Sequence, residues 1–230
     1  AYAYERRDSI AMQLPGGASQ AQEASRTAYL TFAIAPEGGS YRTTIRLDSL
    51  RQGGGNPLAE DSLRAAEGTR WTAVLSPEGR LTSLTADRAS GVGDQIGAAL
   101  PNLFPVLPAG GVQEGASWTD TTQRAVKADA FDATERATTS YQATGRDGRA
   151  VVIQSRTTFQ RTGNGGQGSQ PMEMTSRGAR QATYRFGDGL VLSAQGADSA
   201  EMTITVPALG QTVPVSQRAT WRLSALAPGK

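Results

Sequence analysis

The residue types that most often carry chemistry are scarce in this chain. Its 230 residues include no histidine and no cysteine. Imidazole and thiolate groups serve as catalytic bases, nucleophiles and metal ligands, so their absence excludes Ser-His-Asp and Cys-His catalysis, metal sites built on these groups, and disulfides. A Ser-Lys dyad would need Lys127, because Lys230 is terminal, and no Ser-x-x-Lys motif precedes it. We therefore expect a protein that is not an enzyme and has no cofactor.

The strongest candidates for a cation site are three acidic residues at a spacing of three, Asp129, Asp132 and Glu135. Carboxylate oxygens bind Ca²⁺, but a calcium loop also has a glycine turn and a bidentate glutamate at fixed positions, which this segment lacks. We therefore expect these acids to lie in a solvated turn. The sequence also does not identify a pair of carboxylates at the separation that glycoside hydrolysis requires.

A glycine-rich segment, residues 163–168, reads GNGGQG and matches the G-x-G-x-x-G pattern. A dinucleotide site also needs a helix that begins at the last glycine, so that its amides meet the pyrophosphate. Pro171 and a Thr-rich strand follow instead. The segment is predicted to be a flexible loop, as are residues 51–55.

Arginines are concentrated in one part of the chain. Between residues 136 and 185, eight arginines accompany two acids, Asp147 and Glu173, which gives a local excess of six positive charges. Such a stripe is either a solvated outer face or a surface for an anionic lipid, a polysaccharide or an acidic protein. Nucleic acid is not expected, because the nearby aromatic residues fit strand packing. The arginines assigned to partner or anion binding are Arg136, Arg149, Arg156, Arg161, Arg177, Arg180 and Arg185.

Most of the chain consists of segments in which apolar residues recur at every second position, separated by turn sequences. The turns include Ser76-Pro77-Glu78-Gly79 and Gly187-Asp188-Gly189. The pattern predicts about ten strands in sequential hairpins without βαβ spacing, and a sheet of this size should curl. We therefore expect an all-β, mainly antiparallel fold, with a strongly curved sheet or an incomplete barrel.

Two short helices interrupt the strands. The first follows Asn56 and Pro57 and ends before Gly68. The second lies in an insert near residues 92–104, where an apolar stripe is followed by prolines, and we expect it to cover the mouth or the concave face of the sheet. The residues predicted to form the core or to line a cavity are Trp71, Ile96, Leu100, Phe104, Trp118 and Trp221.

The predicted organisation has three parts: an N-terminal arm or edge strand (residues 1–27), a single antiparallel β domain (28–226) and a tail (227–230). The arm alternates polar and apolar residues and can therefore pair within its own sheet. It could instead add to the exposed edge of a neighbouring molecule, which would assemble protomers into a filament or a surface layer.

The segment that runs from Leu107-Pro108 to Trp118 resembles the Leu-Pro…Val-x-x-Gly-x-x-Trp stretch of poorly characterised bacterial envelope proteins. The order of helix and hairpins is also similar to that of the half-barrel lipoprotein-carrier superfamily. That resemblance implies a curved antiparallel sheet with a helical lid that shelters acyl chains, and it brings no catalytic residue. In physical terms, Pro108 and the glycines make a crossover, and Trp118 begins the next strand.

No apolar run approaches the roughly 20 residues needed to cross a bilayer, so no transmembrane span is expected in the chain given. The abundance of Gly, Ser, Thr and Gln favours a location outside the cytoplasm of a bacterium, in the periplasm or at the cell surface, with any signal peptide or lipid anchor removed. We expect a non-enzymatic binding or scaffolding protein. The leading hypothesis is an accessory subunit bound to protein partners in a larger envelope or membrane complex, because the strands read as Thr- and Ser-rich on both faces. The alternatives are a carrier of an apolar, lipid-like ligand and a filament subunit.

Overall fold

The fold is a single antiparallel sheet with two short α-helices, and its computed structural model describes residues 1–13, 17–55, 60–128, 131–167, 170–187 and 189–227. The strands of the sheet are β1 (Tyr2–Gln13), β2 (Ser19–Glu37), β3 (Ser40–Gly55), β4 (Arg70–Leu75), β5 (Leu81–Ala86), β6 (Ser117–Ala128), β7 (Phe131–Asp147), β8 (Ala150–Gln167), β9 (Gln170–Gly187), β10 (Leu190–Val206) and β11 (Gln211–Ala225). The helices are α1 (Glu60–Ala66) and α2 (Gly91–Ala99), with 3₁₀ turns η1 (Leu100–Asn102) and η2 (Pro207–Leu209). The predicted all-β antiparallel class is confirmed.

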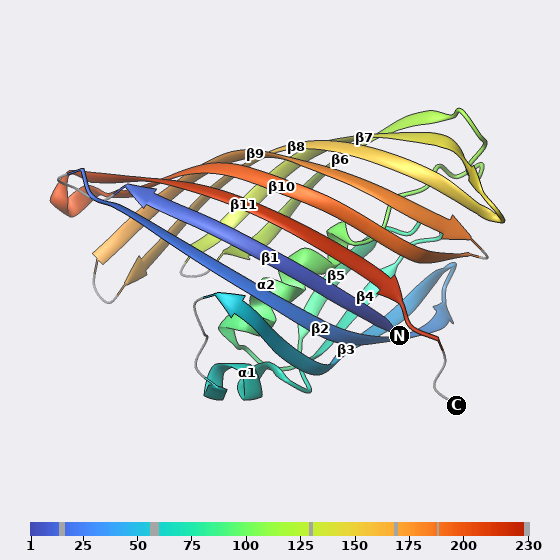
Figure 1. Cartoon of the computed structure of the whole chain (residues 1–230), viewed down its shortest axis with the longest axis horizontal. Coiled ribbons are helices and arrows are strands. Elements are labelled where there is room, and N and C mark those ends of the chain that lie inside the picture. The colour runs from blue at the N-terminus through green and yellow to red at the C-terminus, as the bar shows by residue number, and fades with distance from the viewer. Residues whose placement is uncertain (14–16, 56–59, 129–130, 168–169, 188, 228–230) are drawn as a thin grey trace.

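Chain neighbours pair along the whole sheet, whose order is β5-β4-β3-β2-β1-β11-β10-β9-β8-β7-β6. The one pairing between strands far apart in sequence joins β1 to β11, from Tyr2 opposite Ala225 to Met12 opposite Val215. The two ends of the chain therefore meet in the middle of the sheet, where Figure 1 shows the blue β1 beside the red β11. The sheet spans residues 2–225 without a break between an arm and a domain.

The prediction of an N-terminal edge strand is wrong. β1 is bonded to β11 on one side and to β2 on the other, so its backbone groups are already paired. The edge strands are β5 and β6. A filament or surface layer assembled through the N-terminal strand would need a free edge on β1. Because β1 is paired on both sides, that hypothesis is contradicted.

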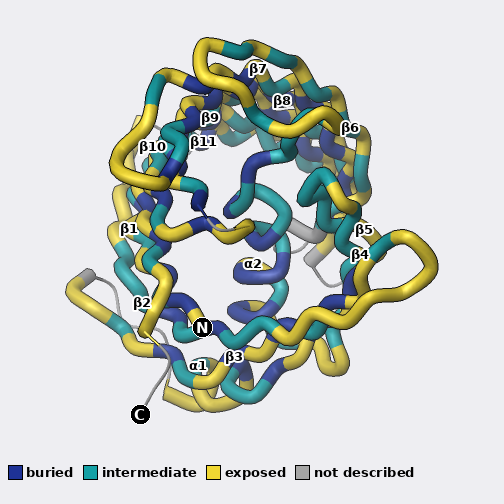
Figure 2. The backbone as a smooth tube through the Cα atoms, turned by 90° about the vertical axis from the view of Figure 1, so that its right-hand side faces the viewer, coloured by how far each residue is buried: buried dark blue, intermediate teal, exposed yellow. Residues whose placement is uncertain are grey.

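The sheet curls until its two edges approach each other. Arg80, in the turn between β4 and β5, forms a bidentate ion pair with Asp120 of β6, with 3.0 Å between Arg80 Nη1 and Asp120 Oδ2. Beside this pair, the amide of Leu107 donates to the carbonyl of Glu78 at 2.7 Å. Figure 2 shows the sheet wrapped around α2, which lies on the concave face as the sequence predicts. The result is a strongly curled half-barrel.

Helix α2 fits closely against the inner face of the sheet. Ser90 caps it by accepting a hydrogen bond from the amide of Gly93 at 3.0 Å, and Val92, Ile96 and Leu100 are buried. A Cβ atom at Gly97 would lie 2.8 Å from Trp71 Nε1, so a glycine is required where the helix crosses that ring. For α1, the predicted end before Gly68 is confirmed, whereas Asn56 and Pro57 lie outside the described residues.

The two faces of the sheet differ in polarity. Along β7, Phe131, Ala133, Ala137 and Tyr141 face inward and are buried, while the intervening threonines and arginines are mostly exposed. The same alternation holds in β8 and β9, where most Thr and Gln side chains point outward. Thr139, Ser155, Thr157 and Ser176 nevertheless lie on the inner face, so the expectation that both faces carry Thr and Ser is confirmed in part.

Two segments predicted to be loops belong to strands instead. Residues 163–167 extend β8 and pair with β9, and residues 51–55 end β3. A Cβ atom at Gly163 would lie 2.8 Å from the Cβ of Ala133, so glycine serves close packing between β7 and β8. Gly168 lies outside the described residues. Strand β9 begins at Gln170, in agreement with the strand expected after the glycine-rich segment, and residues 190–206 form the single strand β10.

The main core fills the concave side beneath α2 and η1. It includes Tyr4, Leu30, Ile45, Tyr184 and Leu223, all buried. Of the predicted core residues, Trp71, Ile96, Leu100 and Trp221 are buried in this cluster, while Phe104 and Trp118 are partly buried against it. Within the part of the chain that the structure describes, no helix is long and apolar enough to span a membrane.

Candidate functional site

Two depressions on opposite faces of the sheet are candidates for a binding site. The inner hollow, about 1,520 Å³, lies on the concave face and is bounded by α2, η1 and strands from β5 around to β6. The outer trough, about 1,460 Å³, runs across the convex face from β6 to β2. They differ in what lines them.

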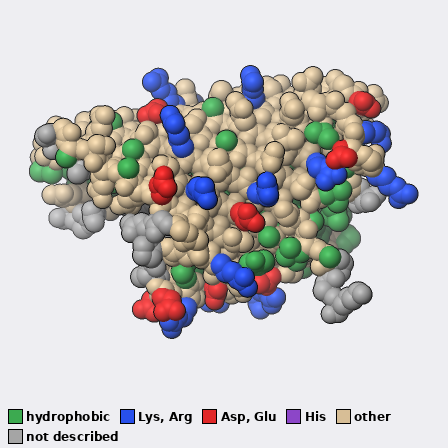
Figure 3. Space-filling view, viewed as in Figure 1, with side chains coloured by type: hydrophobic (Ala, Val, Ile, Leu, Met, Phe, Trp, Pro, Cys, Tyr) green, Lys and Arg blue, Asp and Glu red, His purple; other side chains and the backbone are tan. Residues whose placement is uncertain are grey.

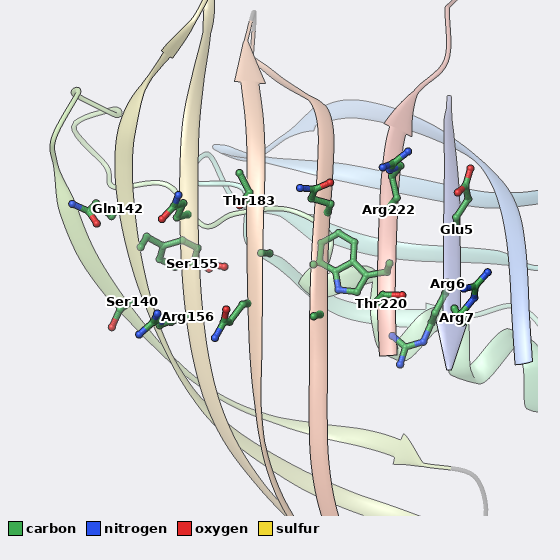
Figure 4. A pocket seen from close by; sticks show the side chains of 18 of the residues that line it. Glu5, Arg6, Arg7, Ser140, Gln142, Ser155, Arg156, Thr183, Thr220 and Arg222 are labelled. Carbon is green, nitrogen blue, oxygen red and sulfur yellow. The ribbon is translucent and has the colours of Figure 1, made fainter. Parts of the chain in front are cut away.

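The outer trough is a wide polar surface. Figure 4 shows polar side chains on successive strands, including Ser140 on β7, Arg156 on β8, Thr183 on β9 and Thr220 on β11. Nearly all of its outward-pointing side chains are polar and exposed or half-exposed. Such a surface is well solvated, and we therefore take the inner hollow as the candidate site.

The inner hollow has a filled end and an open end. Strands β1 and β6 to β11 extend past the helices, as Figure 1 shows on its left side. Beyond the helices, the inner face carries an apolar strip that is separate from the main core. The strip consists of Val126, Phe131, Ala133, Met172, Met174, Met202 and Ile204.

A charged network lies between the filled end and the apolar strip. Glu135 of β7 is 1% exposed and accepts hydrogen bonds from three guanidinium groups. The distances to its carboxylate oxygens are 2.8 Å from Arg124, 2.7 Å from Arg161 and 2.5 Å from Arg180. We call these four residues the Glu135 network. It joins β6, β7, β8 and β9 across the inner face.

Neighbouring groups hold the arginines of the Glu135 network in place. The ring of Phe159 lies under two of them, 4.7 Å from the Arg161 guanidinium carbon and 4.2 Å from that of Arg180. Asn102, at the end of η1, accepts hydrogen bonds from Arg124 at 3.1 Å and from Arg180 at 3.4 Å. The helical insert is therefore tied to the charged band of the sheet.

Electrostatics within the Glu135 network are strong. Burial opposes ionisation of Glu135, but the positive charges of Arg180, Arg124 and Arg161 outweigh it and lower the pKa of this carboxyl to about 2. Burial lowers the pKa of Arg124 and Arg161, and the positive charge of their neighbours lowers it further. The carboxylate is thus fixed in its charged form, while the arginines repel one another.

A second network lies on the same face, nearer the main core. Asp8 of β1 is buried and bonded to Arg6 at 2.8 Å and to Arg26 at 3.4 Å. Asp198 of β10 lies 3.3 Å from Arg6 and accepts a hydrogen bond from Trp221 Nε1 at 3.4 Å. We call Asp8, Asp198, Arg6 and Arg26 the Asp8 network. Although burial opposes its charge, Arg6 has a raised pKa because of Tyr4 and Asp8.

The seven arginines assigned to partner binding are divided between two faces. Arg136, Arg156, Arg177 and Arg185 are exposed on the outer face, and Arg149 is exposed in the turn between β7 and β8. Arg161 and Arg180 point inward and bind Glu135. The stripe seen in the sequence is therefore not one surface, because adjacent positions of a strand point to opposite faces.

Glu135 was expected in a solvated turn, and this expectation is wrong. It has the same strand phase as Phe131, Ala133, Ala137 and Tyr141, which places it on the inner face. Asp132 is exposed on the opposite face, and Asp129 lies outside the described residues. A charged residue in phase with buried ones was the available signal for Glu135, and the same signal marks Asp8 in phase with Tyr2 and Tyr4.

The segment that carries the family resemblance makes the crossover from η1 into β6. Gly111 closes a turn on Pro108 and has a φ of +78°, which favours glycine. Trp118 donates from Nε1 to the carbonyl of Val106 at 2.7 Å and stacks on Tyr141 with ring centroids 5.2 Å apart. The fold therefore explains why the segment has these residues: the glycine closes the turn, and the tryptophan packs at the start of β6.

The chain matches no protein-family model and no curated protein. Among solved structures it is similar to a DUF1329 family protein from Desulfovibrio piger, with 11% sequence identity and a TM-score of 0.22. That similarity covers 100% of this chain and 87% of the other.

Proposed function

We propose that this protein is a non-enzymatic binding protein outside the cytoplasm, and that it carries an amphipathic, lipid-like ligand in the open end of its inner hollow. The observation that carries the proposal is the apolar strip beyond the helices, which lies on the concave face next to a charged band. A hollow lined by apolar side chains with a few converging polar groups is typical of ligand sites.

The polarity of the two faces supports a carrier over the accessory subunit that the sequence favoured. That preference rested on Thr and Ser on both faces, whereas along β7 most of these residues point outward and the inward positions are mainly apolar. Met202 of the strip lines the hollow and also suits a ligand of variable shape, because its side chain is flexible and polarizable. The absence of His and Cys from the sequence supports binding without catalysis.

One observation favours attachment to a larger envelope or membrane complex as a second function. Large apolar side chains are exposed around the end of the half-barrel where the chain termini lie, and Figure 3 shows green side chains gathered toward that side. They are Ile34, Tyr41, Val74, Leu190, Leu192 and Leu226, whereas a further exposed residue, Leu209, lies in η2, away from this group. Exposed apolar groups at one end mark a surface for a protein partner or a membrane.

Native mass spectrometry of the protein purified from its source tests the proposal. A carrier should retain an adduct with the mass of an amphipathic lipid, and an accessory subunit should retain additional protein chains. Met202→Glu, which places a charge in the apolar strip, should reduce the adduct. Thr203→Glu is the matched control, because it adds the same charge at the next residue of β10. A ligand-free monomer, or equal adducts in the two variants, would contradict the carrier.

A further inference from the structure

The Glu135 network contains more positive than negative charge. Arg124, Arg161 and Arg180 all bond to the single carboxylate of Glu135, so three positive charges are matched by one negative charge. The additional acceptor, Asn102 Oδ1, is uncharged. Two positive charges in this group therefore have no partner of opposite sign within it.

Asp198, a carboxylate on the neighbouring strand β10, does not remove this excess. Asp198 is directly opposite Arg180 in the register of β10 and β9, but its oxygens bond to Arg6 and to Trp221. Arg6 and Arg26 in turn balance Asp198 and Asp8. The two networks together have five arginines and three carboxylates, which leaves the same excess of two charges.

The surplus charge faces the inner hollow. All three arginines line it, and their side chains are 23%, 22% and 12% exposed for Arg124, Arg161 and Arg180, respectively. Each guanidinium carries five N–H donors in a planar fork that suits carboxylate and phosphate oxygens. The donors that do not bond to Glu135 or Asn102 can reach an anion in the hollow.

On β6 and β7 the apolar strip begins one inward-facing position beyond Arg124 and Glu135. Val126 is two residues from Arg124 on β6, and Ala133 is two residues from Glu135 on β7. The strip continues across the sheet, because Ala133 pairs with Gly163, Gly163 with Met174, and Met174 with Ile204. Val126, Ala133 and Met202 of the strip line the inner hollow together with the three arginines, so cationic and apolar surfaces are adjacent there.

From this arrangement we infer that Arg124, Arg161 and Arg180 form a binding site for the anionic head of an amphiphile, a carboxylate or a phosphate, whose aliphatic tail lies along the apolar strip. The inference rests on the proposed carrier function and specifies the class of ligand. Bound negative charge would relieve the repulsion among the arginines, and a charge-assisted hydrogen bond to a guanidinium is among the stronger polar contacts in proteins. The lowered pKa of Arg124 and Arg161 is consistent with this repulsion.

Isothermal titration calorimetry with three probes, each below its critical micelle concentration where it has one, tests the inference on the full chain. Dodecyl phosphate has an anionic head and an aliphatic tail, dodecyl maltoside has the same tail with an uncharged head, and inorganic phosphate has the head alone. We expect dodecyl phosphate to bind at least tenfold more tightly than dodecyl maltoside. Competition by inorganic phosphate at low millimolar concentration would show that the head alone is recognised, whereas its failure to compete would show that the tail is also needed.

Arg124→Gln removes one surplus charge and should weaken binding of dodecyl phosphate about tenfold while leaving dodecyl maltoside unaffected. Arg156→Gln is the matched control, because Arg156 is exposed on the outer face. Equal affinity of the wild-type protein for the two detergents would overturn the anionic-head assignment, and this result does not depend on any variant. Failure of both detergents to bind would instead contradict the carrier function itself.

Discussion

Two charge networks lie on the same inner face of one sheet and differ in their balance. The Asp8 network matches two carboxylates with two arginines, and the Glu135 network matches one carboxylate with three. Both networks line the inner hollow. The Asp8 network contacts Tyr4 and Trp221 of the main core, and the Glu135 network lies beside the apolar strip. The balanced network is therefore the one beside the main core, and the network with an excess of positive charge is the one beside the apolar strip.

The arginines respond to this difference. In the Asp8 network the pKa of Arg6 is raised, because Tyr4 and Asp8 outweigh its burial. In the Glu135 network the pKa of Arg124 and Arg161 is lowered by burial and by neighbouring positive charge. A buried charge is tolerated when it is paired and hydrogen-bonded. The Asp8 network is thus complete within the chain, whereas the Glu135 network would gain from an added anion.

The largest effect should follow removal of the one negative charge in the Glu135 network. Glu135→Gln leaves three partly buried arginines without a carboxylate, and we expect a loss of about 3–5 kcal/mol in the free energy of unfolding, as is usual when a buried ion pair is broken. Urea denaturation measures this loss. Asp8→Asn is the matched comparison and should cost less, because Asp198 still lies near Arg6. An equal loss in the two variants would contradict the difference in charge balance.

The pH dependence of stability should show the titration of the same carboxylate, Glu135. The pKa of Glu135 falls from an ordinary 4.5 to about 2 in the folded protein, a difference of about 2.5 that corresponds to about 3 kcal/mol. Because the folded pKa is depressed, this stabilisation is complete above pH 4.5 and is lost as the pH falls toward 2.

The measurement for this pH prediction is the unfolding free energy of the wild type and of Glu135→Gln at several pH values from 6 to 2. Other carboxylates titrate in both proteins, so the difference between the two curves isolates Glu135. We expect the advantage of the wild type to shrink as the pH falls. A constant difference between the two proteins from pH 6 to pH 2 would show that Glu135 does not titrate as described.

The sequence predicted most of the hairpins, the curvature of the sheet and the position of α2, because turns and short periodic patterns are local signals. It did not predict the central place of β1. The partner of Tyr2 is Ala225, at the other end of the chain, and no local pattern marks such a pairing. The sequence therefore indicated an N-terminal arm, although the strand predicted from its alternating residues is confirmed.

The candidate site was harder to predict because charges interrupt the pattern that identifies strands. In the first part of β9 the inward residues include Ser176, Gly178 and Arg180, so hydrophobic alternation does not show which side chains face inward. On charge alone, Arg161 and Arg180 were assigned to partner binding together with the arginines that point outward. Strand phase could have separated them, but their shared partner, Glu135, is fixed only by the pairing of β7, β8 and β9.

The smallest expected effect distinguishes the two networks most directly. Arg124→Gln removes a charge from the network that has too many, so the lost bonds to Glu135 are offset by reduced repulsion, and we expect the free energy of unfolding to stay within about 1 kcal/mol of the wild type. Arg6→Gln makes the same change in the balanced network and deprives Asp8 and Asp198 of a shared partner. It should therefore cost clearly more. Urea denaturation at pH 7 compares the two, and a larger loss for Arg124→Gln would mean that all three arginines are needed to hold Glu135, leaving no surplus charge for a ligand.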